Sequence, residues 1–342
     1  MNRPEETTWR QLRGLLMDEA SVETVRPEVI GAARSGGVLA LLAERCSGVA
    51  EACAEELARE AVAQMHLTLA SREIGALLKE AGVTRAALLK GNATGLLLYA
   101  SPHLRPVVDV DILVGAEDFQ RTLQVLREGG WEDAVPSLSA AAFGKQPFEW
   151  CFDRSFGDVQ LQCDVHQRLV SSDTVQVNHA SILDRAESHP ESPLLLCHPE
   201  DLFLGGVLHT AKDSFDVPLK SWLDLSLLSA HPRVSLERCA ERAAQWSMGN
   251  ITWACLEVLR RWEMAQIPET LIEDLRPAAP VARLLEMLLS GEGARAPRWP
   301  RHRRWGYFFP GAMMGDGPGG AARWMRWRAR SLLRAERRRW TI

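Results

Sequence analysis

Two aspartates placed two residues apart, Asp109 and Asp111, interrupt an apolar segment at residues 107–114. Residues i and i+2 of a strand project from the same face of a sheet, so we expect both carboxylates to lie side by side. Carboxylates that close repel each other, and burying them without a partner is costly. Magnesium prefers oxygen ligands and is often held by one or two carboxylates together with substrate phosphates. The pattern therefore indicates a magnesium site, with two solvated aspartates on an exposed strand as the alternative.

A third carboxylate, Asp164, breaks a second alternating apolar segment, which we predict to be a strand at residues 159–165. If this strand lies beside residues 107–114, Asp164 completes a metal triad with the first two aspartates and can accept the proton of a nucleophile. His166 lies two residues further on and would share the face of Asp164. For His166 we favour a hydrogen-bonded, half-buried histidine over a catalytic one.

A short apolar run at residues 86–89 is followed by Lys90, Gly91 and Asn92, which predicts a strand and then a turn. Glycine lets the backbone approach a ligand closely, and the amino terminus of a following helix favours phosphate. Lys90 could pair with phosphate oxygens. The alternative is an ordinary turn in which Asn92 caps the helix.

Further predicted elements must position these residues. Between residues 83 and 197 we expect helices at 94–99 and 117–128, and strands near Trp131 and at 148–152. The rest is helical, with helices at about 51–81, 199–212, 218–230, 235–246 and 248–264. The sequence therefore predicts an α+β fold, a small mixed sheet with helices flanked by helical regions. The expected parts are residues 1–82 (helical), 83–197 (core), 198–290 (helical) and 291–342 (an Arg/Trp-rich tail).

The composition is that of a globular protein, with 46% apolar and 25% charged residues in 342. The net charge of -4 argues against general affinity for nucleic acid, whereas the arginine-rich tail could contact an anionic surface. Seven scattered cysteines without a C-x-x-C pair predict reduced thiols in a cytoplasmic protein. No apolar run approaches the length of a transmembrane segment.

Taken together, these motifs resemble the bacterial uncharacterised nucleotidyltransferase family, which belongs to the polymerase-β-like nucleotidyltransferase superfamily. The resemblance covers roughly residues 83–230 and continues into the later helices through His209 and residues 219–225. The residues that carry it in the core are Leu89-Lys90-Gly91, Tyr99, Pro102, Arg105, Asp109-x-Asp111, Gly130-Trp131 and Asp164-x-His166.

The resemblance implies a small nucleotidyltransferase-type sheet and roles for particular residues. Asp109 and Asp111 would bind two Mg²⁺ ions, and Asp164 would complete the site as a base or orient one. The nucleoside triphosphate would contact Lys90, Gly91, Asn92, Arg105 and Lys220. Superfamily members usually carry Gly-Ser or Gly-Gly at the turn, whereas this chain has Gly-Asn.

His166, His209 and Asp224 are secondary candidates. Lys220 and Asp224 are spaced i, i+4, so an ion pair on a helix surface is the alternative for both. Packing or hydrogen bonding is the alternative for His209.

The resemblance also implies an activity: transfer of a nucleoside monophosphate from a nucleoside triphosphate to an acceptor. The acceptor stays open between a peptide, a saccharide and a small molecule. Two alternatives stay open as well. One is transfer of a glycosyl or other group from a nucleotide-activated donor at the same metal site, and the other is a non-catalytic nucleotide-binding scaffold.

Overall fold

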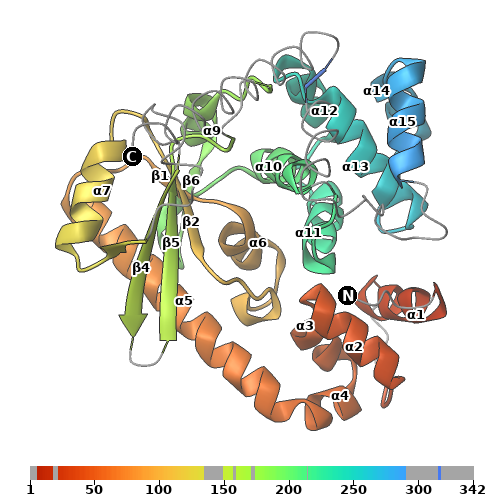
Figure 1. Cartoon of the computed structure of the whole chain (residues 1–342), viewed down its shortest axis with the longest axis horizontal. Coiled ribbons are helices and arrows are strands. Elements are labelled where there is room, and N and C mark those ends of the chain that lie inside the picture. Colours follow the sequence, from red (N-terminus) through yellow and green to blue (C-terminus); the bar gives the residue numbers. More distant parts are fainter. Residues whose placement is uncertain are drawn as a thin grey trace, which may run out of the picture.

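The computed structural model describes residues 6–17, 22–134, 149–156, 159–170, 174–213, 215–289 and 315–316. These residues form a seven-stranded mixed sheet surrounded by helices, which confirms the α+β expectation (Figure 1). Along the sheet, the strand order is β3-β4-β5-β2-β1-β7-β6. The strands are β1 (Ala86–Leu88), β2 (Val110–Val114), β3 (Glu132–Asp133), β4 (Glu149–Phe156), β5 (Val159–His166), β6 (Glu187–His189) and β7 (Ser192–Leu196).

Helices make up most of the remainder. Those before and within the sheet are α1 (Glu6–Met17), α2 (Pro27–Gly36), α3 (Leu39–Arg45), α4 (Ser47–Ala52), α5 (Ala54–Glu80), α6 (Lys90–Leu98), the 3-10 helix η1 (Pro102–Leu104), α7 (Phe119–Glu128) and α9 (His179–Arg185). Those after it are α10 (Pro199–Lys212), α11 (Leu219–Ser229), α12 (Leu236–Gln245), α13 (Gly249–Arg261), α14 (Glu269–Leu275) and α15 (Ala279–Leu289). Helices α7 and α6 lie on opposite sides of the strands, and α10 and α11 pack against α6 (Figure 1).

The predicted later helices are confirmed: α10 to α13 agree with the expected ranges to within three residues. The long predicted helix is α5, and four shorter helices precede it. Strands β6 and β7 have no counterpart among the predicted elements. Pro193 within β7 argues against a strand in the sequence, but its ring packs closely against Gly75 of α5, and β7 pairs in parallel with β1.

The strand that carries the paired aspartates is shorter than predicted. β2 begins at Val110, so Asp109 lies in the bend before it and the prediction of a strand over residues 107–114 is wrong at its start. The side-chain amide of Gln64 on α5 pairs with the backbone N–H and C=O of Val107, at 2.9 and 2.8 Å. Because these backbone groups are already paired with Gln64, they cannot form the hydrogen bonds to a neighbouring strand that would extend β2.

The turn after β1 also differs from the prediction. α6 begins at Lys90, so Gly91 and Asn92 lie in its first turn rather than ahead of a helix at 94–99. Asn92 is not the helix cap, because its Oδ1 accepts a hydrogen bond from the Asp111 N–H at 3.1 Å. Lys90 has a φ of 45°, a left-handed conformation that is uncommon for residues other than glycine. Such strained backbone often lies at ligand sites.

Aromatic side chains connect the first helix with the later helices. Trp262, just after α13, makes edge-to-face contacts with Trp9 of α1 and Trp222 of α11, at centroid distances of 5.3 and 5.2 Å. The Arg13 guanidinium adds a 3.0 Å hydrogen bond to the Trp262 carbonyl. The helical regions on either side of the core therefore pack against each other. The four-part division of the chain stays a prediction.

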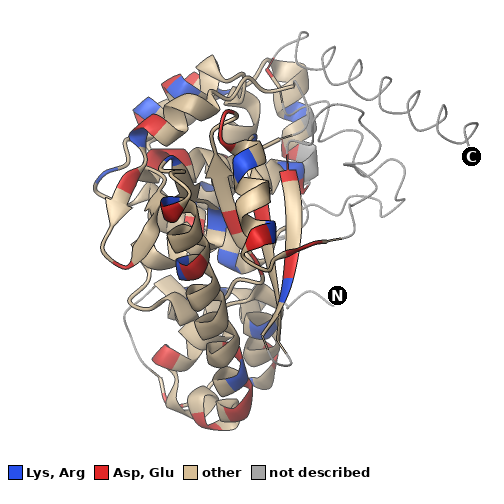
Figure 2. Ribbon diagram, turned by 90° about the vertical axis from the view of Figure 1, so that its left-hand side faces the viewer, with Lys and Arg blue, Asp and Glu red and all other residues tan. Residues whose placement is uncertain are grey.

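Charged residues of both signs alternate over the ribbon in the view of Figure 2. None of the helices in the described ranges is both long enough and apolar enough to span a membrane. The basic tail expected at residues 291–342 lies outside the described residues except for positions 315–316. Its predicted contact with an anionic surface stays a prediction.

Candidate metal and nucleotide site

The third predicted carboxylate lies beside the Asp-x-Asp motif. β2 and β5 are parallel neighbours, and their register places Asp111 opposite Asp164. Asp111, Asp164 and His166 each offer one ligand atom, and these three atoms lie within 4.8 Å of one another. His166 Nε2 is 2.8 Å from Asp111 Oδ1. Two neighbouring strands therefore bring together three residues that the sequence singled out. We call Asp111, Asp164 and His166 the acidic cluster.

Asp109 is not part of the acidic cluster, but it lines the same cavity as Asp111. Burial, followed by repulsion from Asp111, raises the pKa of Asp109 to about 6. Burial also raises the pKa of Asp164, and the charge of Asp111 adds to this effect. These carboxylates are short of positive charge, a situation that a divalent cation relieves.

Lys90 supplies one positive charge to the cluster, through a 2.5 Å hydrogen bond from Nζ to Asp111 Oδ1. Burial disfavours the ammonium, but the Asp111 carboxylate outweighs burial and raises the pKa of Lys90. Burial also opposes ionisation of Asp111, yet the hydrogen bond with His166 and the charge of Lys90 lower its pKa. Lys90 and His166 thus share one carboxylate oxygen. A metal ion at that oxygen requires Lys90 to move aside.

Two residues on β4 join this site although the sequence did not single them out. The antiparallel register places Cys151 opposite Asp164 and Glu149 opposite His166. The Cys151 thiol donates a hydrogen bond to Asp164, and burial raises the pKa of that thiol. Glu149 Oε2 lies 3.9 Å from His166 Nδ1. Glu149 and Cys151 are spaced i, i+2, as Asp109 and Asp111 are. Only the register of β4 against β5 shows that they lie beside Asp164 and His166.

The donor set fits a magnesium ion. Asp164 Oδ1 is buried and accepts no hydrogen bond from any side chain or backbone group that the structure describes. Leaving a buried carboxylate oxygen without a partner is costly, so the position favours a cation. Asp109, Asp111 and Asp164 would supply the oxygen ligands that Mg²⁺ prefers, although Asp109 lies outside the acidic cluster. His166, bonded to Asp111, would orient that ligand.

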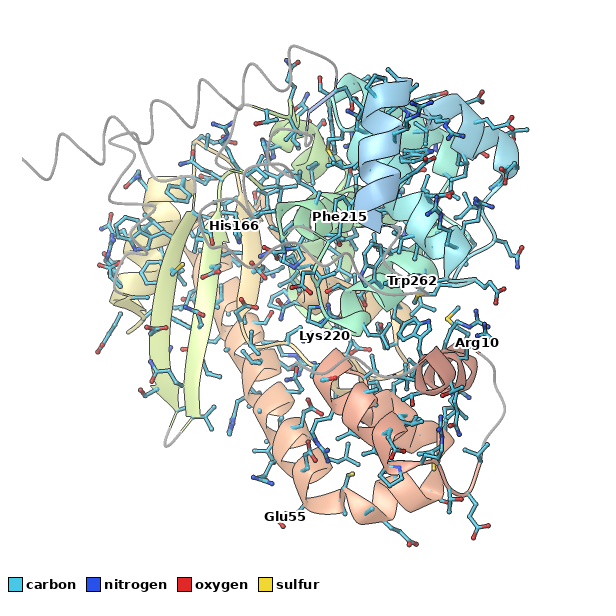
Figure 3. All side chains as sticks on the ribbon, turned by 45° about the vertical axis from the view of Figure 1, so that its right-hand side comes forward. Arg10, Glu55, His166, Phe215, Lys220 and Trp262 are labelled. Atoms are coloured by element: carbon cyan, nitrogen blue, oxygen red, sulfur yellow. The ribbon has the colours of Figure 1, made fainter. Side chains whose placement is uncertain are left out.

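Asp111 and His166 of the cluster line a cavity of about 330 Å³, together with strand ends and helices α10 and α11, whereas Asp164 is not among its lining residues. Figure 3 shows His166 among the strands and Lys220 at the start of α11. Small-molecule sites have volumes of roughly 300–1,000 Å³, so the cavity suits a ligand of modest size. The predicted site residues that line it are Lys90, Gly91, Arg105, Asp109, Asp111, His166, His209, Lys220 and Asp224.

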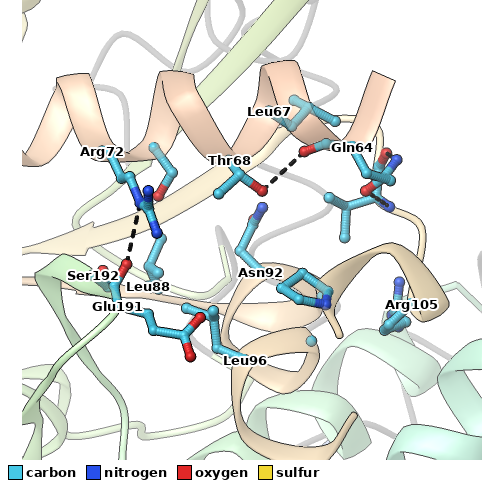
Figure 4. A pocket seen from close by; sticks show the side chains of 15 residues that line it. Gln64, Leu67, Thr68, Arg72, Leu88, Asn92, Leu96, Arg105, Glu191 and Ser192 are labelled. Atoms are coloured by element: carbon cyan, nitrogen blue, oxygen red, sulfur yellow. Dashed lines mark hydrogen bonds between the residues drawn. The ribbon is translucent and has the colours of Figure 1, made fainter. Parts of the chain in front are cut away.

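A second cavity, of about 40 Å³, lies between α5 and α6 (Figure 4). Its volume holds a few water molecules at most, which excludes a nucleotide. Asn92 lines this small cavity and not the large one, and its side chain holds the start of β2. Contact between Asn92 and a triphosphate stays a prediction.

Arg105 and Asp224 form a buried ion pair. The Arg105 guanidinium donates three hydrogen bonds of 2.7 to 3.1 Å to the Asp224 carboxylate. Thr94 and Tyr99 donate two more to the same carboxylate, at 3.1 and 2.8 Å. Asp224 therefore pairs with Arg105 rather than with Lys220, and the alternative of an i, i+4 helix-surface pair is wrong. The Arg105–Asp224 pair connects the loop before β2 to α11.

The remaining candidates have identifiable contacts. A Cβ at Gly91 would come within 2.4 Å of Val107 and 2.8 Å of Arg105, so close packing accounts for this glycine. Lys220 Nζ donates to the Pro106 carbonyl at 2.8 Å, and burial lowers its pKa. His209 Nδ1 lies 3.5 Å from Asp213 Oδ2. Direct contact of these residues with a nucleotide stays a prediction.

Comparison with known proteins matches residues 16–263 to a family model described as "Uncharacterised nucleotidyltransferase". The match extends well beyond residues 83–230 and includes the helices on both sides of the core. No curated protein and no solved structure matches the chain.

Proposed function

The chain is a member of the uncharacterised nucleotidyltransferase family, and on that premise we propose a magnesium-dependent transfer of a nucleoside monophosphate from a nucleoside triphosphate to an acceptor. The observation that carries the proposal is the acidic cluster, in which Asp111 and His166 line the large cavity and a buried Asp164 oxygen has no hydrogen-bond partner among the described residues. The acceptor would be a hydroxyl group of a peptide, a saccharide or a small molecule.

The charged side chains around the cavity suit a triphosphate. Bound Mg²⁺ would supply neutralisation of phosphate charge. The ammonium groups of Lys90, Lys212 and Lys220 line the same cavity and can donate to phosphate oxygens. When Lys90 leaves Asp111, its ammonium group is free to donate a hydrogen bond to a phosphate oxygen. Positive charge from three helices would orient the triphosphate against the carboxylates.

Asp164 is suited to receive a proton. Burial raises its pKa, which strengthens it as a base. In the proposed reaction the acceptor hydroxyl transfers its proton to Asp164 and its oxygen bonds to the α-phosphorus. The bond from that phosphorus to the bridging oxygen breaks, and pyrophosphate leaves with the electron pair. Asp111 would bind Mg²⁺ in place of Lys90, and its contact with His166 would keep the carboxylate in position.

The proposal is tested with isosteric variants. Asp111→Asn and Asp164→Asn should lose transfer of label from [α-³²P]NTP to acceptors in a cell extract by at least 100-fold. They should also lose magnesium-dependent binding of a non-hydrolysable NTP in calorimetry. Asp184→Asn is the matched control, because this side chain on α9 is 64% exposed and pairs with Arg85.

Retained transfer in Asp111→Asn or Asp164→Asn would refute this site. The mass of the labelled product separates the chemistries: a gain of a nucleoside monophosphate supports the proposal, and a gain of a sugar supports transfer from a nucleotide-activated donor. Nucleotide binding without any transfer would support the scaffold alternative.

A further inference from the structure

We infer that Gly205 of α10 keeps open an apolar arm of the large cavity and that this arm receives the base of the nucleotide. The inference rests on the proposed function and adds to it the part of the site that selects the nucleoside. Gly205 lines the cavity and is half-buried.

Several polar groups of the cavity lie near the acidic cluster. The charges of Lys90, Lys212 and Asp111 all act on the pKa of His209, which burial lowers. His209 of α10 therefore lies near the acidic cluster. Lys220 is close enough to Asp109 for that carboxylate to act on its pKa. This part of the cavity matches a triphosphate with its metal.

Apolar residues line the same cavity. Gly205 lies one helical turn before His209, about 6 Å along α10, and shares its face, and Asp201, one turn before Gly205, lines the cavity too. Leucine and isoleucine residues line the cavity together with Gly205: Leu169, Ile182, Leu202, Leu225 and Leu228. A nucleoside triphosphate needs both kinds of lining, since its charge lies in the phosphates and its base offers two apolar faces.

Two adjacent glycines in α10 show why Gly205 is informative. Glycine inside a helix costs about 1 kcal/mol relative to alanine, so it needs a reason. A Cβ at Gly206 would lie 2.9 Å from Leu225 Cδ2, and close packing of α10 on α11 explains that glycine. A Cβ at Gly205 would meet nothing within 4 Å, so packing does not explain it. The open space beside Gly205 is the arm of the cavity.

The test compares anionic ligands that carry a nucleoside with one that does not. Binding of ATP, GTP, CTP and UTP is measured by calorimetry with magnesium, alongside inorganic tripolyphosphate, which lacks ribose and base. Wild-type protein should bind at least one nucleotide ten or more times more tightly than tripolyphosphate. Gly205→Leu should remove that advantage and leave the affinity for tripolyphosphate within twofold. Gly205→Ala should give a smaller loss in the same direction.

Gly31→Leu is the matched control, because Gly31 is an exposed glycine of helix α2 whose Cβ would also meet nothing within 4 Å. It should leave both affinities unchanged, and circular dichroism should show that all three variants fold.

Unchanged nucleotide binding in Gly205→Leu would overturn the inference. Equal losses for nucleotide and tripolyphosphate would also overturn it, since they would assign Gly205 to the packing of α10. Lost transfer with intact nucleotide binding would overturn it by assigning the arm to the acceptor. If wild-type protein binds neither ligand, the proposed function itself fails, which is a separate outcome.

Discussion

Lys90 is the residue on which the acidic cluster depends most directly in the metal-free protein. It combines a left-handed backbone conformation with a 2.5 Å bond to the buried Asp111 carboxylate. A strained residue at the junction of β1 and α6 indicates a ligand site rather than a purely structural turn. Lys90 and a metal ion compete for the same oxygen, so one should weaken the binding of the other.

Lys90→Met preserves length and removes this competing charge. Without metal, the variant should lose about 1–3 kcal/mol of unfolding free energy, because Asp111 loses its counterion. Its affinity for Mn²⁺, measured by calorimetry in the absence of nucleotide, should rise several-fold. Lys79→Met on the exposed end of α5 is the control. Equal or weaker Mn²⁺ binding in Lys90→Met would contradict the competition.

At the scale of elements, the ion pair between Arg105 and Asp224 positions the large cavity. The pair joins the loop that precedes β2 to α11, and Thr94 in the middle of α6 and Tyr99 at its carboxyl end donate to the same carboxylate. The Gln64 amide holds the next residues of the loop from α5. Asp109 and Asp111 follow directly, so their placement depends on these contacts between helices and loop.

Asp224→Ala should lower the free energy of unfolding by about 3–5 kcal/mol, because it leaves the Arg105 guanidinium buried without its charge partner. Urea denaturation measures the change. The matched Asp184→Ala breaks an exposed pair with Arg85 and should cost less than about 1 kcal/mol. Similar losses in the two variants would show that the buried pair is not the stronger connection.

At the scale of the whole molecule, both helical regions pack on the core and on each other through Trp9, Trp222 and Trp262. The family match from residue 16 to 263 covers the sheet and helices α2 to α13, whereas Trp9 of α1 lies before it. The tryptophan contacts connect the first helix to the later helices. Protonation of a residue that destabilises one element should lower the free energy of unfolding of the whole protein.

His179 at the start of α9 gives such a titration. Its Nε2 accepts a hydrogen bond from the Leu169 N–H at 3.0 Å. Burial, and then the charge of Arg168, lowers the pKa of His179 to about 4. Above about pH 6.5 the imidazole is neutral in both the folded and unfolded chains. As the pH falls towards 4, the unfolded chain takes up the proton first, so the folded state loses about 2–3 kcal/mol.

His179→Gln keeps an acceptor for the Leu169 N–H but takes up no proton. Urea unfolding of both proteins at pH 7.0 and pH 4.5 isolates this residue from the carboxylates that titrate in the same range. The wild type should lose more stability than the variant between these values. A constant difference between the two proteins at both values would contradict the assignment.

The sequence alone predicted the α+β class and the later helices, because hydrophobic periodicity is a local property, whereas the chemistry of Asp109, Asp111 and Asp164 stays a prediction. It also predicted His166 as a neighbour of Asp164, since i and i+2 share a strand face. It missed β6, β7 and the start of α6, where a proline packed against α5 and a lysine with a left-handed backbone depend on distant packing.

Only the tertiary structure decided which residues meet. Register places Asp164 between Asp111 on one side and Cys151 on the other, pairings that no spacing along the chain reveals. Arg105 and Asp224 are 119 residues apart, and their pairing follows from the approach of α11 to the loop before β2. The sequence determines the chemical type of each side chain. Long-range packing determines the distances between these side chains and which charges come into contact.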